Sequence, residues 1–102
     1  MQFVILARDI SGQDTLRRRQ DARTEHMKGI RDLKQGGQMI DGGALLDPDG
    51  NMCGSLILCD FPDRAALDTY LDSEIFKREG IWGEIEVLPF RRIDWTALMS
   101  GG

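Results

Sequence analysis

The distribution of apolar and polar residues along the chain contains four short apolar runs that are rich in aromatic and branched side chains. Runs of this length and composition are typical of β-strands. The segment DPDGN at residues 47–51 separates the second run from the third and is typical of a hairpin turn. The predicted strands cover residues 2–8, 38–46, 52–61 and 84–93.

Two longer segments carry apolar residues at helical spacing. The first covers residues 15–35 and stops before Gly36 and Gly37, which end a helix. The second covers residues 62–72, with Pro62 in its first turn. Their predicted buried positions are Leu16, Ala22, Met27, Ile30 and Leu33 in the first helix, and Ala66, Leu67, Tyr70 and Leu71 in the second.

The predicted order is β-α-β-β-α-β. Before the last strand, the segment at residues 73–82 contains a short helix or turn that ends at Gly80. This is the ferredoxin-like split pattern, an α+β fold with a four-stranded antiparallel sheet and both helices on one face. Pro89 has no backbone N–H, so it places the last strand at an edge or beside a bulge. The pair Gly42 and Gly43 indicates a bulge in the second strand, or a close approach to its backbone.

Both faces of the predicted sheet are apolar, although two helices cover only one of them. Val4 and Leu6 in the first strand, and Leu56 and Leu58 in the third, point to the uncovered face. Leaving such a face in water loses many kcal/mol, at about 25 cal/mol per Å² of apolar area. We therefore expect a homodimer packed sheet to sheet, with a barrel-like core between the subunits. The alternative is a monomer whose open face is partly shielded by residues 94–102.

Chain length bounds the number of domains, and net charge limits the kinds of partner that the protein can bind. The 102 residues suit one domain, residues 1–102, with a flexible tail from about residue 96. The net charge of −4 disfavours nucleic acid and anionic membranes as partners. The basic run from Arg17 to Arg23 is flanked by acidic residues, so we interpret it as a solvated helix face. No signal peptide or membrane span is recognised.

The two cysteines, Cys53 and Cys59, lie on the same face of one predicted strand and too far apart along it to bond each other. This favours a reduced, cytoplasmic setting. With one histidine, separated carboxylates and two strand cysteines, the chain shows no metal-ligand spacing. We expect no metal and no cofactor.

His26 is the only histidine in the chain, and it falls in the middle of the first predicted helix. It is four residues after Ala22 and four before Ile30, so it shares or borders the buried face of that helix. Arg23 borders the same face. A partly buried imidazole beside a carboxylate can exchange a proton near neutral pH. The competing interpretation is an ordinary packed or surface histidine.

Several short motifs in fixed order resemble the YciI-like (YCII-related) family over nearly the whole chain. They are Arg23 and His26 as Arg-x-x-His, the pair Gly42 and Gly43, the pair Gly54 and Ser55, Asp72 after the second helix, and the pair Pro89 and Phe90. The resemblance implies a dimeric ferredoxin-like α+β barrel with an active-site histidine and aspartate, which we assign to His26 and Asp72. The family pattern has Asp-Pro followed by an aromatic residue where this chain has DSEIF, so Glu74 is a second candidate for the carboxylate.

On this resemblance, Asp72 accepts a hydrogen bond from one imidazole nitrogen of His26, and the other nitrogen moves a proton on the substrate. Arg23 is the candidate for holding an anionic oxygen, because a guanidinium suits that role; the alternative is a solvated charge that makes an i,i+3 contact. Ser55 is expected to donate a hydrogen bond to the substrate or to pack. The expected chemistry is isomerisation, elimination or dehydrohalogenation of a small cyclic or enolisable compound.

Two other functions remain open at this point. One is a non-catalytic module that binds or senses a small ligand on the same dimeric barrel. The other is a cofactor-independent oxygenase of the related dimeric barrel class, whose apolar aromatic cavity would use residues such as Trp82 and Trp95.

Overall fold

The computed structural model describes residues 1–101 and contains one four-stranded sheet in the order β2-β3-β1-β4. All three neighbouring strand pairs are antiparallel. The strands are β1 (Gln2–Asp9), β2 (Met39–Leu46), β3 (Met52–Asp60) and β4 (Trp82–Phe90). The helices are α1 (Thr15–Gln35), α2 (Arg64–Ser73), α3 (Ile75–Arg78) and α4 (Trp95–Ser100).

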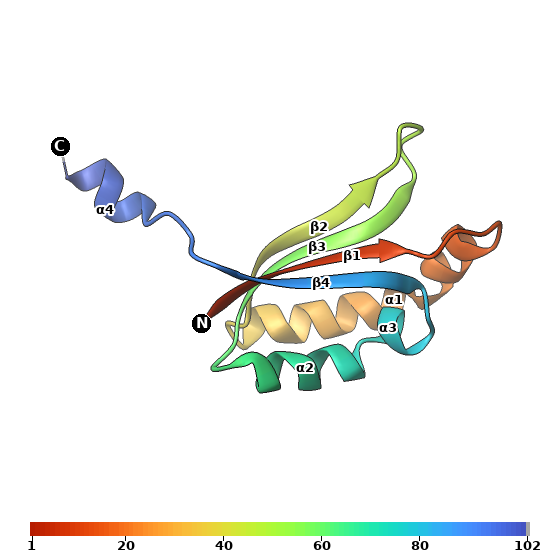
Figure 1. Cartoon of the computed structure of the whole chain (residues 1–102), viewed down its shortest axis with the longest axis horizontal. Coiled ribbons are helices and arrows are strands. Elements are labelled where there is room, and N and C mark those ends of the chain that lie inside the picture. Colours follow the sequence, from red (N-terminus) through yellow and green to blue (C-terminus); the bar gives the residue numbers. More distant parts are fainter. Residues whose placement is uncertain (102) are drawn as a thin grey trace.

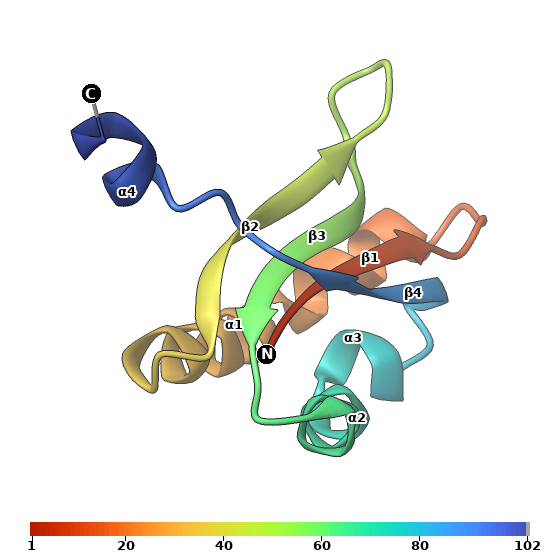
Figure 2. The same cartoon turned by 60° about the vertical axis from the view of Figure 1, so that its left-hand side comes forward.

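The order of elements and strands confirms the predicted ferredoxin-like α+β fold. The helices α1, α2 and α3 lie together on one face of the sheet, and the opposite face is left open (Figures 1 and 2). β1 lies in the middle of the sheet, where Ile5 pairs with Ile57 of β3 on one side and with Val87 of β4 on the other. None of the helices within residues 1–101 has the length and apolar character needed to cross a membrane.

The core lies between the sheet and the three helices that cover it. Alternation along β1 directs Phe3, Ile5 and Ala7 into this layer, where all three are buried. Leu67 and Leu71 of α2 meet them from the helix side, which confirms the buried stripe predicted for that helix. The other buried apolar residues are Ala22, Ile57, Cys59, Phe61, Phe76, Ile81 and Trp82.

Several local predictions are confirmed or corrected by the structure. β4 is an edge strand, which is where Pro89 is tolerated. Gly42 lies close to the neighbouring strand, since a Cβ at this position would be 2.6 Å from the carbonyl oxygen of Leu56. The second helix begins later than predicted, because Asp63 is its N-cap and Pro62 precedes it. The Asp63 carboxylate accepts a hydrogen bond from the backbone N–H of Ala66, which gives the chain a better start for the helix than proline alone.

The C-terminal segment leaves the sheet after β4 and extends away from the rest of the chain (Figure 1). It carries α4 (Trp95–Ser100), in which Trp95, Leu98 and Met99 are exposed. The predicted tail, residues 96–102, covers most of this helix and ends at residue 102, which lies outside the described part. Its flexibility stays a prediction.

Candidate functional site

His26 lies on the side of α1 that faces α3 and the sheet. Its side chain is 10% exposed, and its Nδ1 atom lies 2.7 Å from Oε1 of Glu74. The imidazole stacks on the ring of Phe76 with 4.0 Å between centroids, and Trp82 meets it edge-on. The hydrogen bond and the stacking fix the orientation of the ring, so Nε2 is the nitrogen left for a bound molecule.

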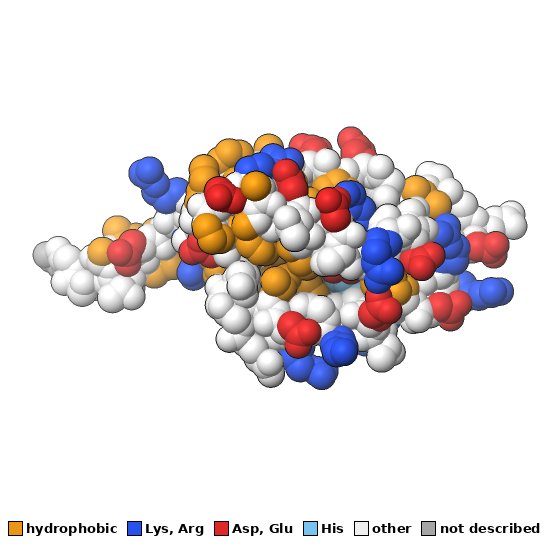
Figure 3. Space-filling model, turned by 90° about the horizontal axis from the view of Figure 1, so that it is seen from below, with side chains coloured by type: hydrophobic (Ala, Val, Ile, Leu, Met, Phe, Trp, Pro, Cys, Tyr) orange, Lys and Arg blue, Asp and Glu red, His pale blue; other side chains and the backbone are white. Residues whose placement is uncertain are grey.

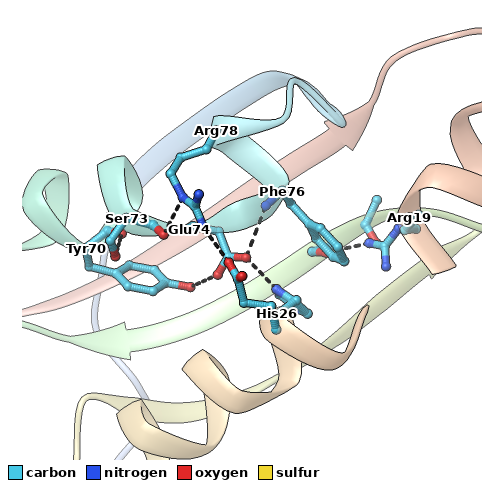
Figure 4. Close-up of polar contacts among 10 residues, drawn as sticks. Arg19, His26, Tyr70, Ser73, Glu74, Phe76 and Arg78 are labelled. Atoms are coloured by element: carbon cyan, nitrogen blue, oxygen red, sulfur yellow. Dashed lines mark hydrogen bonds and ion pairs between the residues drawn. The ribbon is translucent and has the colours of Figure 1, made fainter. Parts of the chain in front are cut away.

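Glu74 occupies the break between α2 and α3. Its backbone is extended, so the chain changes direction after Ser73, and its carboxylate caps α3 by accepting a hydrogen bond from the N–H of Phe76 at 3.3 Å. This break turns the Glu74 side chain toward α1, where it meets His26 (Figure 4). The local sequence thus places a carboxylate beside the histidine through helix capping.

The Glu74 carboxylate is almost completely buried but well supplied with donors. Its other oxygen, Oε2, accepts a hydrogen bond from the hydroxyl of Tyr70 at 2.9 Å. Burial alone would raise the pKa of Glu74, but the hydrogen bond and charge of His26, together with the donors of Tyr70 and Phe76, outweigh it and hold the pKa below its usual range. Glu74 is therefore a carboxylate that stays ionised beside the imidazole.

Tyr70 completes this arrangement on the side away from the imidazole. Burial raises the pKa of its hydroxyl above the usual value, and the neighbouring charge of Glu74 raises it further. The hydroxyl thus keeps its proton and remains a donor to Glu74.

A cavity of about 210 Å³ lies between α1 and the strands β2 and β3, and His26 forms part of its wall. From the helix side the histidine shows only as a small pale-blue surface (Figure 3). The lining residues are Arg19, Arg23, His26, Met27, Ile30, Met39, Gly42, Gly43, Ala44, Met52, Ser55 and Ile57. A larger hollow of about 660 Å³ lies at the start of the C-terminal segment, but it is wide open and its walls hold no histidine. The smaller cavity is therefore the candidate site.

Arg19 is a buried residue of this cavity that was not among the predicted site residues. Its Nε donates to Oδ2 of Asp9 at 2.8 Å, and its Nη2 donates to Oγ of Ser55 at 2.7 Å. Its guanidinium lies 4.7 Å from the centre of the Phe76 ring, which also stacks on His26 (Figure 4). A usable signal existed, because Arg19 precedes His26 by seven residues, or two helical turns, and therefore shares its helix face.

The structure does not place Asp72 next to the imidazole. Asp72 is on the exposed side of α2, and its carboxylate pairs with Lys77. The assignment of Asp72 as the partner of His26 is thus corrected to Glu74, the second candidate. The signal was the aromatic residue of the family motif, which stands two positions after the acidic residue. In this chain Phe76 is two positions after Glu74, whereas the residue two positions after Asp72 is not aromatic.

The two predicted binding residues both line the cavity, in different ways. Ser55 is buried on β3, where its hydroxyl accepts the hydrogen bond from Arg19. Arg23 is exposed on α1, one turn before His26. The structure therefore brings His26, Arg23 and Ser55 to one cavity and leaves Asp72 outside it.

Comparisons with known proteins agree on the fold. The family model described as "YCII-related domain" matches residues 1–91. "Protein YciI" from Escherichia coli O6:H1 is 24% identical over 99 residues, which cover 91% of this chain and 99% of that protein, and the protein of the same name from Shigella flexneri gives the same values. The solved structure of 5-chloro-2-hydroxyhydroquinone dehydrochlorinase (TftG) from Burkholderia phenoliruptrix AC1100, in complex with 2,5-dihydroxybenzoquinone, superimposes with a TM-score of 0.80 at 22% identity. It covers 90% of this chain and 95% of its own, so the two proteins share a fold.

Proposed function

The chain belongs to the YCII-related family, and from this premise we propose that it is a small-molecule enzyme in which His26, held by Glu74, transfers a proton. The reaction class is isomerisation, elimination or dehydrohalogenation of a small cyclic or enolisable compound. The observation that carries the proposal is the 2.7 Å contact between His26 Nδ1 and a buried, ionised carboxylate at the wall of a cavity.

The geometry supports a simple division of roles. For Nε2 to act as the base, His26 starts in the tautomer that donates its Nδ1–H to Glu74. In an elimination from the keto tautomer of a chlorinated hydroquinone, Nε2 takes the proton of a remaining ring hydroxyl, and the O–H electron pair forms a C=O bond. The adjacent ring C=C shifts toward the carbon that bears the chlorine, and chloride leaves with the C–Cl pair. The charged imidazole is then stabilised by the Glu74 carboxylate. The step is balanced without an oxidant or a reductant.

The substrate class is supported by the shape of the site and by the structural neighbour. A cavity of about 210 Å³ with mostly apolar walls suits a compound of one ring. The protein of similar fold is a dehydrochlorinase of a chlorinated hydroxyhydroquinone, and its structure contains a dihydroxybenzoquinone. We therefore propose hydroxylated or chlorinated single-ring compounds as the first substrates to test.

The test is chloride release from 5-chloro-2-hydroxyhydroquinone under argon, compared with a protein-free control. The unaltered protein is expected to accelerate release, and His26→Asn to slow it by about 100-fold, since general-base catalysis contributes about that factor or more. Asp72→Asn is the matched control, because that carboxylate is exposed and paired with Lys77. Equal rates for His26→Asn and the unaltered protein would contradict the proposal. Binding of the compound without chloride release would favour the ligand-binding module instead.

We also propose that the chain forms a homodimer through the open face of its sheet. Leu56, Leu88 and Phe90 are exposed there, at 39%, 48% and 47%. Val4 and Leu6 of β1 lie on the same face between β3 and β4. Exposed apolar residues gathered on one sheet face are typical of an interaction surface, and a second copy offers the same face in return.

A further inference from the structure

The guanidinium of Arg19 has hydrogen-bonding capacity that the rest of the chain does not use. Of its five N–H groups, one on Nε donates to Asp9, and the two on Nη2 have acceptors in the Gly54 carbonyl at 2.6 Å and the Ser55 hydroxyl at 2.7 Å. The other amino group, Nη1, reaches only the thioether sulfur of Met52 at 4.0 Å within residues 1–101. A thioether is a weak acceptor, so Nη1 is more available to a bound oxygen than Nε or Nη2, which already donate to oxygen atoms of the protein.

The position of this donor is fixed before any ligand arrives. The side chains of Arg19 and Asp9 are each 5% exposed, and their 2.8 Å ion pair holds the plane of the guanidinium. The Phe76 ring supports it from one side, at 4.7 Å. Because the orientation is already set, a ligand that binds Nη1 loses little free energy to ordering this side chain.

The charge of the cavity wall favours anions. The charged residues Arg19 and Arg23 line the cavity beside His26, and none of its lining residues is an aspartate or a glutamate. Asp9 and Glu74 neutralise part of this charge from behind the wall, since each contacts a lining residue without lining the cavity itself. A small anion therefore meets donors and positive charge, with no facing carboxylate to repel it.

The remaining walls favour a flat molecule. They are formed mainly by apolar side chains and by the backbone of Gly42 and Gly43, with Ile57 on β3 and Ile30 on α1. A Cβ at position 42 would be 2.7 Å from the Cε of Met39, so glycine at this position lets the Met39 side chain pack against β2.

We propose that Arg19, through Nη1, is the anchor for an oxyanion on a single aromatic or quinonoid ring, so that the cavity selects ionised phenols and enols over their neutral ethers. This proposal rests on the proposed function, because it describes the substrate class of the same cavity. Asp9 acts as a positioning residue that holds Arg19. Arg23, the guanidinium expected from the sequence to hold the anionic oxygen, contributes charge at the exposed rim.

The experiment compares two probes that share a ring and differ in charge: 4-nitrophenol, at a pH where it is ionised, and 4-nitroanisole, its neutral methyl ether. We expect the unaltered protein to bind the phenolate about 10-fold or more tightly than the ether, since a charge-assisted hydrogen bond has about that effect. Arg19→Lys keeps a cation beside Asp9 but loses the fork of donors, so phenolate binding should weaken about 10-fold while ether binding is unchanged. Arg23→Lys is the matched control and should change phenolate binding by no more than about twofold.

A measurement on the unaltered protein covers the case in which Arg19→Lys does not fold. In a nitrogen-15 NMR titration, the side-chain signals of Arg19 should shift with the phenolate and stay in place with the ether. Equal affinity for the two probes, or a larger loss in Arg23→Lys than in Arg19→Lys, would overturn the assignment.

The outcomes also separate this proposal from the proposed function. Phenolate binding requires no proton transfer, so His26→Asn is expected to keep the preference for the phenolate while losing chloride release. A protein with chloride release but no anion preference would refute the role of Arg19 and leave that of His26 intact. If the protein prefers the anion but His26→Asn does not change chloride release, the role of His26 is refuted and that of Arg19 is kept.

Discussion

The Glu74 carboxylate accepts hydrogen bonds from an imidazole, a phenol and a backbone N–H, in a position that is nearly closed to water. These three donors come from three places in the chain, α1, α2 and the first turn of α3. Their combined effect is that a buried acidic group keeps its charge, although burial by itself disfavours the charged form. The same contacts therefore orient the imidazole that we propose as the base, and they stabilise the fold.

This coupling predicts a pH dependence of stability. Because the pKa of Glu74 is lowered in the folded protein, its ionisation stabilises the fold above its ordinary value of 4.5, and this stabilisation is lost as the pH falls through the folded-state pKa. Urea unfolding should thus show a decline in the free energy of unfolding below about pH 4.5. In Glu74→Gln the decline should be smaller, and the free energy at pH 7 should be lower by about 1–3 kcal/mol because the donors lose their charged acceptor.

Asp72→Asn is the control for this measurement, since Asp72 is exposed and its pair with Lys77 lies at the surface. In Asp72→Asn, the free energy of unfolding should decline below about pH 4.5 as it does in the unaltered protein. A Glu74→Gln variant with the same acid limb as the unaltered protein would show that the Glu74 contacts contribute no pH-dependent stability.

Single residues of the site were predictable only where a helix repeat or a family motif marks them. His26 follows from its spacing to Ala22 and Ile30, and the structure indeed places it beside the core. The choice between Asp72 and Glu74 depends on where α2 ends, and two residues at a helix end separate an exposed side chain from a buried one. The helix repeat places Arg19 on the same face as His26, but its ion pair with Asp9 and its hydrogen bond to Ser55 join α1 to two strands, so they could not be read from the helix alone.

Among the elements, β2 shows how two adjacent glycines differ in what they allow. A Cβ on Gly42 would come within 2.6 Å of the Leu56 carbonyl oxygen, whereas nothing lies within 4 Å of a Cβ on Gly43. In a pleated strand these two positions face opposite sides of the sheet. At Gly42 the place of a Cβ is already filled by the Leu56 carbonyl and the Met39 side chain.

We predict that Gly42→Ala destabilises the fold by about 1–3 kcal/mol, because backbone and Met39 must shift to admit the methyl group. Gly43→Ala, the neighbouring control, should change the free energy of unfolding by no more than about 1 kcal/mol and in the stabilising direction. Chemical denaturation of both variants checks this. Equal losses in the two variants would contradict the close packing at Gly42.

The elements themselves follow from the sequence with small errors at their ends. The range predicted for the first helix, residues 15–35, is that of α1, because Gly36 and Gly37 give a definite stop. β4 begins at Trp82, two residues before the predicted start, because its first residues contain a glycine and lack an apolar alternation. Strand order was predictable through the β-α-β-β-α-β pattern, whereas α4 was not, since it packs on nothing that the pattern contains.

For the whole molecule, the open sheet face predicts the behaviour in solution. If two copies pack through this face, Leu56→Glu should convert a dimer into a monomer, because the charge would be buried at the interface without a partner. Leu98→Glu on α4 is the control, since Leu98 is also exposed but lies on the C-terminal segment. Sedimentation equilibrium gives the mass in each case. A monomeric unaltered protein, or dissociation by Leu98→Glu and not by Leu56→Glu, would contradict packing through the sheet.

His26 and Glu74 are 48 residues apart in the chain; His26 lies on α1, and Glu74 lies between α2 and α3. No single helix or strand contains both groups. Proximity of the two side chains thus arises late, after segments distant in sequence have found each other, and contacts of this high order are slow to form. Recovery of the proposed activity after denaturation would consequently follow the last cooperative phase of refolding. The two fragments made by cleavage within the β2–β3 hairpin would lack that activity until they reassociate.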